Sequence, residues 1–273
     1  MKVGSRLVRV FIFIGLIVSP AFAHEPVFSL GPETIFKGGL GIETEFKFDQ
    51  ADKDKELLLH YEILYGLTEN LGVTLEIPQF LKKKDGMDSS NGLGDISLRG
   101  KYQFYKKDSL GAQDKATIIY GLKFPAGGED KKPSLGSGAI DHLFGLSVGH
   151  ESTKIYGFAT GRYKLKTDSG SKDKGDQFLF DVSFGLRPWL RPYKSWDLVV
   201  LLENSYVYSQ KDEIDGVSQT NTGGQKLFIG PSLLWSLRNV MLKGGVQFPV
   251  WQDLNGTQSE TDLRSIVALE YHF

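Results

Sequence analysis

Cysteine is absent from the 273-residue sequence. Disulfide bonds, thiolate zinc sites and cysteine nucleophiles are therefore excluded. An excess of basic residues is also lacking, because 33 aspartates and glutamates balance 32 lysines and arginines. A chain without a basic field has no electrostatic footprint for nucleic acid. The sequence accordingly predicts no nucleic-acid partner.

Long apolar runs are missing after residue 23, so no segment reaches the roughly 18 to 20 residues of a transmembrane helix. The one sustained run, residues 10–18, follows Lys2, Arg6 and Arg9 and precedes Ala21-Phe22-Ala23. A basic start, a short apolar stretch and a small-x-small end predict a cleaved secretory signal peptide over residues 1–23. The mature chain would begin at His24 with 29 basic and 33 acidic residues, a formal charge of −4.

In place of long apolar runs, the chain has segments in which apolar and polar residues alternate. Along residues 36–48 the four charges, Lys37, Glu43, Glu45 and Lys47, all fall on one face. A slip of one residue would turn these charges towards lipid, so the register is strongly specified. Twelve segments show this pattern and predict an all-β fold, a transmembrane antiparallel up-and-down β-barrel of about 12 strands. The segments are residues 36–48, 57–65, 71–77, 95–104, 116–124, 140–148, 154–166, 178–187, 196–203, 227–235, 240–248 and 263–273.

The connections between these segments alternate in length. Long polar connections follow the odd-numbered segments, as in residues 49–55, 82–92 and 210–224. Most of those after even-numbered segments are tight, although residues 106–114 and 188–194 are of intermediate length. Long outer loops and short inner turns are typical of outer-membrane barrels. The predicted organisation is a signal peptide (residues 1–23), an N-terminal linker (residues 24–33) and a transmembrane barrel (residues 34–273).

The last segment ends in an aromatic residue, Phe273, with Tyr271 two positions before it. This ending resembles the closing strand of outer-membrane barrels, which is the signal that the barrel-assembly machinery reads. It predicts export to the outer membrane of a Gram-negative bacterium, with that machinery, outer-membrane lipid and lipopolysaccharide as partners. The lipopolysaccharide phosphates could neutralise the basic run at residues 82–84.

The polar face of the alternating segments supplies the candidate functional residues. By parity these side chains point into the barrel, where they would line a pore that admits small solutes selectively. The alternative is a salt-bridge network that seals a structural barrel, which would then bind ligands or partners through its outer loops. The predicted pore-lining residues are Glu43, Glu45, His60, Glu62, Glu76, Asp95, Arg99, Lys101, Lys123, Asp141, Arg162, Asp181, Glu203, Lys243, Gln247, Arg264 and Glu270.

Catalytic and metal-binding patterns are weak. Some twelve-stranded outer-membrane phospholipases place a His and a Ser two apart, and the pair here is His150 and Ser152. It falls at a predicted inner turn without an adjacent Asn to orient the base, which disfavours lipid hydrolysis. The five histidines lie on different segments without ligand spacing. Copper chelation by a new N-terminal His24 is a remote alternative, and the sequence predicts no enzyme activity, metal or cofactor.

Several short motifs resemble landmarks of the outer-membrane barrel family named for the meta-pathway of phenol degradation. These are Gly94-Asp95-Ile96-Ser97-Leu98 with Lys101-Tyr102, Gly230-Pro231, Gly245-Val246-Gln247-Phe248-Pro249 and the aromatic terminus. The resemblance covers most of the mature chain. It implies a porin-like barrel that passes small molecules, aromatic compounds among them, by passive diffusion.

Overall fold

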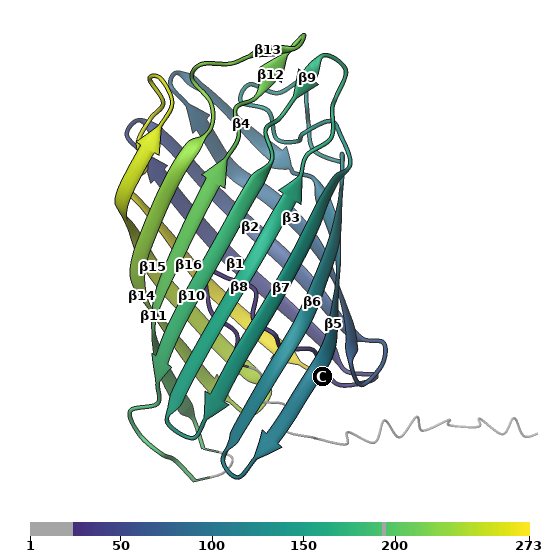
Figure 1. Ribbon diagram of the computed structural model, residues 1–273, viewed down its shortest axis with the longest axis vertical. Helices are drawn as coiled ribbons and strands as arrows, with labels where there is room; N and C mark the ends of the chain where they lie inside the picture. Colours follow the sequence, from purple (N-terminus) through teal and green to yellow (C-terminus); the bar gives the residue numbers. More distant parts are fainter. Residues whose placement is uncertain (1–23, 193–194) are drawn as a thin grey trace, which may run out of the picture.

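The computed structural model describes residues 24–192 and 195–273, so the predicted signal peptide lies outside the described residues. The chain forms a closed antiparallel barrel (Figure 1). Thirteen strands belong to one sheet, and β4 (Asp88–Leu93) pairs with β3 alone, which leaves twelve strands in the ring. They are β1 (Leu40–Ala51), β2 (Asp54–Gly66), β3 (Leu71–Asp85), β5 (Ile96–Ser109), β6 (Ala112–Phe124), β7 (Asp141–Ser152), β8 (Ile155–Leu165), β10 (Gln177–Leu186), β11 (Asp197–Ser209), β14 (Gly224–Leu237), β15 (Val240–Leu254) and β16 (Leu263–His272). The predicted all-β barrel of twelve strands is confirmed.

The first and last strands close the ring. Strand β1 pairs with β2 on one side and with β16 on the other. Glu43 on β1 consequently lies opposite Glu62 on one neighbour and Glu270 on the other. The backbone amide of Phe273 also donates to the Leu40 carbonyl at 2.8 Å, at the start of β1. A ring without edge strands satisfies the backbone polar groups internally, which a bilayer requires.

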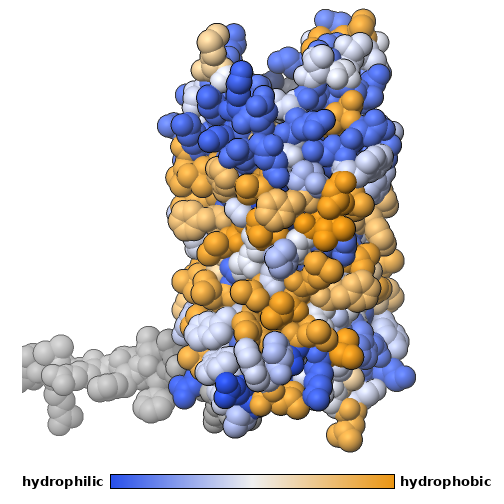
Figure 2. Space-filling view, turned by 90° about the vertical axis from the view of Figure 1, so that its left-hand side faces the viewer, coloured by the Kyte–Doolittle hydropathy of each residue, from blue (hydrophilic) through white to orange (hydrophobic). Residues whose placement is uncertain are grey.

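The pleat separates an apolar outer face from a polar inner face. On β7, Leu146 is 50% exposed whereas the adjacent Ser147 is completely buried. Figure 2 shows the result on one side of the molecule, a belt of hydrophobic side chains below a strongly hydrophilic upper end. In the described part of the chain, no helix is long and apolar enough to cross a membrane.

Several connections are shorter than the sequence predicts, because strands continue beyond the apolar belt with polar side chains. The predicted loop at residues 49–55 is a tight turn between β1 and β2, with Asp52 at φ 49°. Residues 106–114 are likewise mostly strand, and Gly111 (φ 72°) lies in the turn. The predicted loop at residues 82–92 is a hairpin of β3 and β4. Short strands β9 (Lys172–Asp173), β12 (Glu213–Ile214) and β13 (Val217–Ser218) form a separate small sheet in the upper loops.

Residues 24–33, predicted to be a linker, lie inside the barrel as an irregular segment that bends at residues 27–29 and 32 (Figure 1, purple). The segment continues to residue 39, so β1 begins at Leu40 rather than at the predicted Phe36. A turn precedes the strand, in which the Gly39 amide donates to the Phe36 carbonyl at 2.8 Å. Gly66 allows this close approach, since a Cβ there would lie 1.9 Å from the Phe36 carbonyl oxygen. Residues 24–39 are called the N-terminal segment below.

Candidate functional site

The seventeen predicted pore-lining residues are all on the inner face of the barrel and are mostly buried there. Strand parity positions them, because alternate residues of a strand point to the same side. Thirteen are buried, and Glu76, Lys123, Arg162 and Arg264 are partly buried. Their role in lining a pore stays a prediction.

Ion pairs between neighbouring strands organise part of this face. The Lys243 ammonium lies 2.6 Å from Glu43 and 3.1 Å from Glu270, so β15 is tied to β1 and β16 by one cation. The imidazole of His272 lies 2.6 Å from Glu270. A buried charge is tolerated only when it is paired and hydrogen-bonded, and this arrangement meets the condition.

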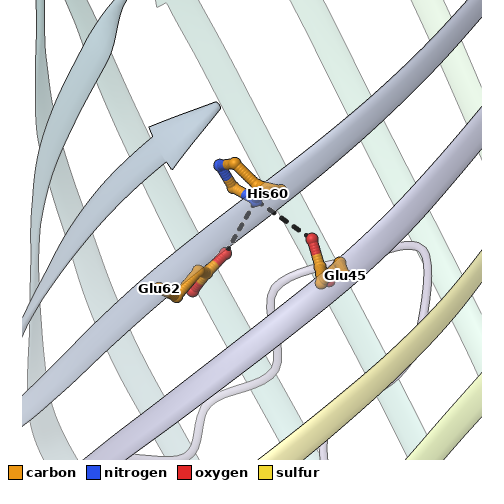
Figure 3. Close-up of side chains that lie close together, drawn as sticks. All are labelled: Glu45, His60 and Glu62. Carbon is orange, nitrogen blue, oxygen red and sulfur yellow. Dashed lines mark hydrogen bonds and ion pairs between the residues drawn. The ribbon is translucent and has the colours of Figure 1, made fainter. Parts of the chain in front are cut away.

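A second group of ion pairs surrounds His60. Its Nδ1 atom lies 3.0 Å from Glu45 and 3.4 Å from Glu62, from neighbouring strands (Figure 3). Two carboxylates and an imidazole within 4.8 Å of one another have the geometry of a metal site. However, Lys47 lies 2.6 Å from Glu45 and Arg99 lies 3.1 Å from Glu62. These cations already neutralise both carboxylates, so the three side chains are part of an ion-paired network.

Glu203 on β11 has a different kind of partner. Its carboxylate accepts hydrogen bonds from the backbone amides of Val27 (2.9 Å) and Phe28 (3.0 Å) in the N-terminal segment. The hydroxyl of Ser232 donates to the same carboxylate, and Ser183 does so at 3.4 Å. Glu203 is 1% exposed, so it acts as a buried anchor for the segment.

Hydroxyl groups on the wall hold the next part of the segment. Ser147 and Thr160 both donate to the Leu30 carbonyl, at 3.0 and 2.7 Å. Thr117 donates to the Pro32 carbonyl. These bonds satisfy backbone carbonyls that a strandless segment would otherwise bury without partners.

Two glycines of the wall make room for the side chains of the segment. A Cβ atom at Gly149 would lie 2.8 Å from Pro32, and one at Gly245 would lie 2.7 Å from the ring of Phe28. Real Cβ atoms do not approach so closely, so larger residues at these positions would push the segment away. The wall is therefore shaped around the N-terminal segment.

Further ion pairs hold the first ten residues of the segment. Lys101 pairs with Glu25, and Lys115 pairs with Glu33. At its beginning, the imidazole of His24 lies 3.5 Å from Asp197 and 3.9 Å from Glu151. Of these residues only Lys101 was among the sequence candidates. Lys115 has the same parity as Thr117 and Lys123 on β6, which is the signal that could have identified it.

An upper loop closes over part of the lumen. Asp95 accepts hydrogen bonds from the backbone amides of Gly127 (3.0 Å) and Ser137 (2.7 Å) and lies 3.2 Å from Lys123. Lys83 donates to the Ser134 carbonyl at 3.0 Å. The loop at residues 125–140 is thus folded against the inner face.

Cavities lie at both ends of the barrel. One of about 500 Å³ at the end that holds the C-terminus is lined by His24, Tyr156 and Arg187, among others. At the opposite end, a cavity of about 300 Å³ is lined by Lys226, Phe228 and Arg264, among others. The N-terminal segment, anchored at Glu203, lies between these two ends.

The candidate hydrolase pair does not come together. His150 lies 2.6 Å from Asp114, whereas the Ser152 hydroxyl donates to the Ile155 carbonyl in the turn between β7 and β8. A nucleophile needs a base within hydrogen-bond reach. Each side chain has a structural partner instead.

The closed ring, the apolar belt and the charged inner face define a β-barrel of the outer-membrane type. Among solved structures, the chain is similar to an outer membrane channel from Pseudomonas putida F1, with a TM-score of 0.73 and 13% identity over 92% of this chain and 100% of that one. It is also similar to the NanC porin, with a TM-score of 0.52 and 8% identity over 84% of this chain and 98% of that one. Both likenesses concern the fold.

The sequence profile of one family, described as "Putative MetA-pathway of phenol degradation", matches residues 23–270. The chain belongs to this family, as the motifs at Gly94, Gly230 and Gly245 predicted. A search among curated proteins finds no match.

Proposed function

We propose that this protein is a passive channel of the outer membrane, through which small solutes diffuse along the polar lumen. One observation carries the proposal: cavities at the two ends of a charged lumen are separated by a segment that hydrogen bonds and ion pairs hold in place. Such contacts can break and re-form without covalent change. Displacement of the N-terminal segment would join the two cavities and open the path.

Small aromatic compounds are among the solutes we propose. The family description refers to phenol degradation, and the rings of Phe28 and Phe228 both lie in the lumen beside Arg264 (5.5 and 4.0 Å from the guanidinium carbon). Aromatic rings pack favourably against one another and against guanidinium groups. These side chains would give an aromatic solute an apolar surface inside a polar lumen.

A closed barrel that acts through its outer loops is the second candidate. The anchored N-terminal segment and the folded loop at residues 125–140 favour it, since both reduce the free cross-section. In that case the ion pairs of the lumen would serve stability only.

The two candidates differ in conductance. The mature protein, refolded and inserted in a planar bilayer, should give discrete single-channel steps, and their size should fall with salts of larger ions. A folded protein that stays silent at all voltages would contradict the channel and favour the closed barrel.

The location and the export route are also proposals. We place the mature chain, from His24, in the outer membrane of a Gram-negative bacterium, inserted by the barrel-assembly machinery and in contact with lipopolysaccharide. Membrane fractionation and N-terminal sequencing of the protein from the outer-membrane fraction would test both; an N-terminus upstream of His24 would contradict cleavage after Ala23.

A further inference from the structure

Ion pairing in the lumen is unequal between the two signs of charge. Nearly every inner-face carboxylate forms an ion pair with a nearby cation. Arg99 pairs with Glu62 and Glu76, Lys123 pairs with Asp95 and Asp141, and Arg162 pairs with Asp181. Lys243 likewise forms ion pairs with Glu43 and Glu270. Glu203, without a cation, is satisfied by backbone amides and hydroxyls.

Three cations of the lumen have no such partner. Within the described residues, no carboxylate lies within 4.0 Å of the charged nitrogens of Lys164, Lys226 or Arg264. Lys226 donates to the Thr261 hydroxyl at 2.8 Å, and Arg264 donates to the neutral Gln247 amide oxygen at 2.8 Å. These three side chains thus carry positive charge without an ion pair, although Asp49 lies opposite Arg264 where β1 pairs with β16.

All three lie towards the same end of the barrel. Lys164 is the second-last residue of β8, Lys226 is near the start of β14, and Arg264 is near the start of β16. The chain directions put these positions at the end opposite to the C-terminus, where the long loops are (Figure 1). A solute arriving from outside would meet them before it reached the N-terminal segment.

Lys164 also lines a cavity of about 160 Å³, called the Lys164 cavity here. Four cations line it, Arg99, Lys123, Lys164 and Lys166, against only two carboxylates, Glu76 and Asp141. Leu143 and Gly121 contribute an apolar part of the lining. Glu62 and Asp95, which do not line the cavity, also pair with Arg99 and Lys123, so Lys164 is the cation of the lining that has no carboxylate of the described residues within 4.0 Å. The cavity therefore offers a cation without an ion pair beside an apolar surface, in a space that fits a small organic molecule.

The cavity at Lys226 and Arg264 is lined by charges of both signs. Asp49 and Asp54 line it as well, although Asp54 accepts a hydrogen bond from the Gly86 amide at 2.8 Å. Its Phe228 ring lies 4.0 Å below the Arg264 guanidinium. This cavity contributes cations and an aromatic surface to the entrance rather than a net charge.

Two loop lysines near this region are less stable as cations than free lysines. Burial, together with the neighbouring Lys123, lowers the pKa of Lys166 below its usual range. Burial, Lys123 and Lys83 do the same to the pKa of Lys174. The neighbouring cations add to the effect of burial, and an anion nearby would offset both.

We propose that the outer half of the lumen is an anion-selective entrance, in which the Lys164 cavity binds the carboxylate of a small organic acid and the apolar lining holds its body. Charged side chains that line a narrow, low-dielectric passage concentrate ions of opposite sign. The inference deepens the proposed channel function and rests on it for permeation, whereas binding at the Lys164 cavity does not require an open pore.

Ion selectivity tests the entrance. In a planar bilayer with a potassium chloride gradient, the reversal potential of the wild type should indicate a chloride-to-potassium permeability ratio above one. Lys164→Gln, Lys226→Gln and Arg264→Gln should each lower the ratio. The exposed loop variants Lys131→Gln and Lys211→Gln, which remove the same charge outside the lumen, should leave it unchanged. A conducting wild type that prefers potassium would overturn the inference while the channel function stands.

Equilibrium binding tests the cavity independently of conductance. Benzoate, titrated calorimetrically into the folded protein in detergent, should bind, whereas benzamide, its neutral counterpart of similar size, should not bind measurably. Lys164→Gln should weaken benzoate binding about tenfold or more, as expected for a lost charge-assisted hydrogen bond, and Lys131→Gln should not. Equal affinity for benzoate and benzamide, or equal benzoate affinity in Lys164→Gln and wild type, would overturn the inference even if the protein conducts.

Discussion

At the scale of the residue, buried charges in this lumen are stabilised in two ways. Lys243 is paired with two carboxylates, whereas Glu203 accepts hydrogen bonds from neutral groups. The first arrangement links strands of the ring to one another. The second links the ring to the N-terminal segment. Substitutions should therefore affect barrel stability in one case and the position of the segment in the other.

Lys243→Met should lower the free energy of unfolding by about 3–5 kcal/mol, because Glu43 and Glu270 would remain buried without their shared cation. Glu43→Gln should lower the free energy of unfolding much less, because Lys243 would still pair with Glu270, which lies 3.1 Å away. Urea unfolding in lipid vesicles, followed by tryptophan fluorescence, measures both, with the exposed Lys211→Met as control. Equal stability of Lys243→Met and the control would show that the triad contributes nothing.

Glu203→Gln should loosen the N-terminal segment while the barrel stays folded. The amide group keeps one acceptor oxygen but directs donors towards the amides of Val27 and Phe28. Hydrogen bonds to charged groups contribute about 1.5–3 kcal/mol, so exchange in the segment should accelerate about 10- to 100-fold. Hydrogen exchange followed by mass spectrometry of residues 24–36 measures this, with Glu260→Gln in an exposed loop as control. Unchanged exchange would refute the anchor.

At the scale of the element, each strand has one face towards lipid and one face towards the lumen. On the lipid face, the free-energy cost of a charged side chain depends on its depth in the membrane. Leu146 on β7 is 50% exposed near the middle of its strand, and His150 is on the same face near the inner end. Leu146→Arg should cost about 2–4 kcal/mol, whereas His150→Arg should cost about 0–1 kcal/mol. The yield of heat-modifiable, folded protein on electrophoresis compares the two variants. Equal yields would contradict the assignment of this face to lipid.

The strands were predictable from the sequence because apolar and polar residues alternate in every segment that crosses the hydrophobic belt. Glu43, Glu62 and Glu270 were assigned to the inner face on parity alone, and they are buried side by side there. Strand ends were predicted less well, because β3 and β6 extend into polar residues outside the belt. Hydropathy does not distinguish such residues from a loop.

The N-terminal segment could not be predicted in the same way, because no periodic pattern encodes it. Its contacts are backbone groups that meet hydroxyls far along the chain, such as Leu30 with Ser147 and Thr160. The one sequence signal is the presence of small residues at inward positions, Gly149 and Gly245 among them. Glycine in a strand often marks a close approach of another backbone, but it does not identify which segment approaches.

At the scale of the whole molecule, the barrel and the N-terminal segment are two parts with different roles. The ring is closed by continuous strand pairing, and the segment is held by side-chain contacts that can release it. The anion-attracting entrance lies on one side of the segment and a cavity of about 500 Å³ on the other. If the segment controls passage, then fixing it covalently should abolish conductance without changing the ring.

A disulfide between Pro32→Cys and Gly149→Cys would fix the segment, since a Cβ at Gly149 comes within 2.8 Å of the Pro32 side chain and the chain has no other cysteine. The oxidised double variant should conduct far less than the wild type, and reduction should restore the steps because only the cross-link is removed. The reduced double variant, which lacks the Pro32 ring, controls for the contact that the side chain at position 149 makes with the ring of Phe158, 2.8 Å away. Gly149→Cys alone would also clash with Pro32. Equal conductance before and after reduction, with the cross-link verified by mass spectrometry, would show that solutes pass without movement of the segment at Pro32.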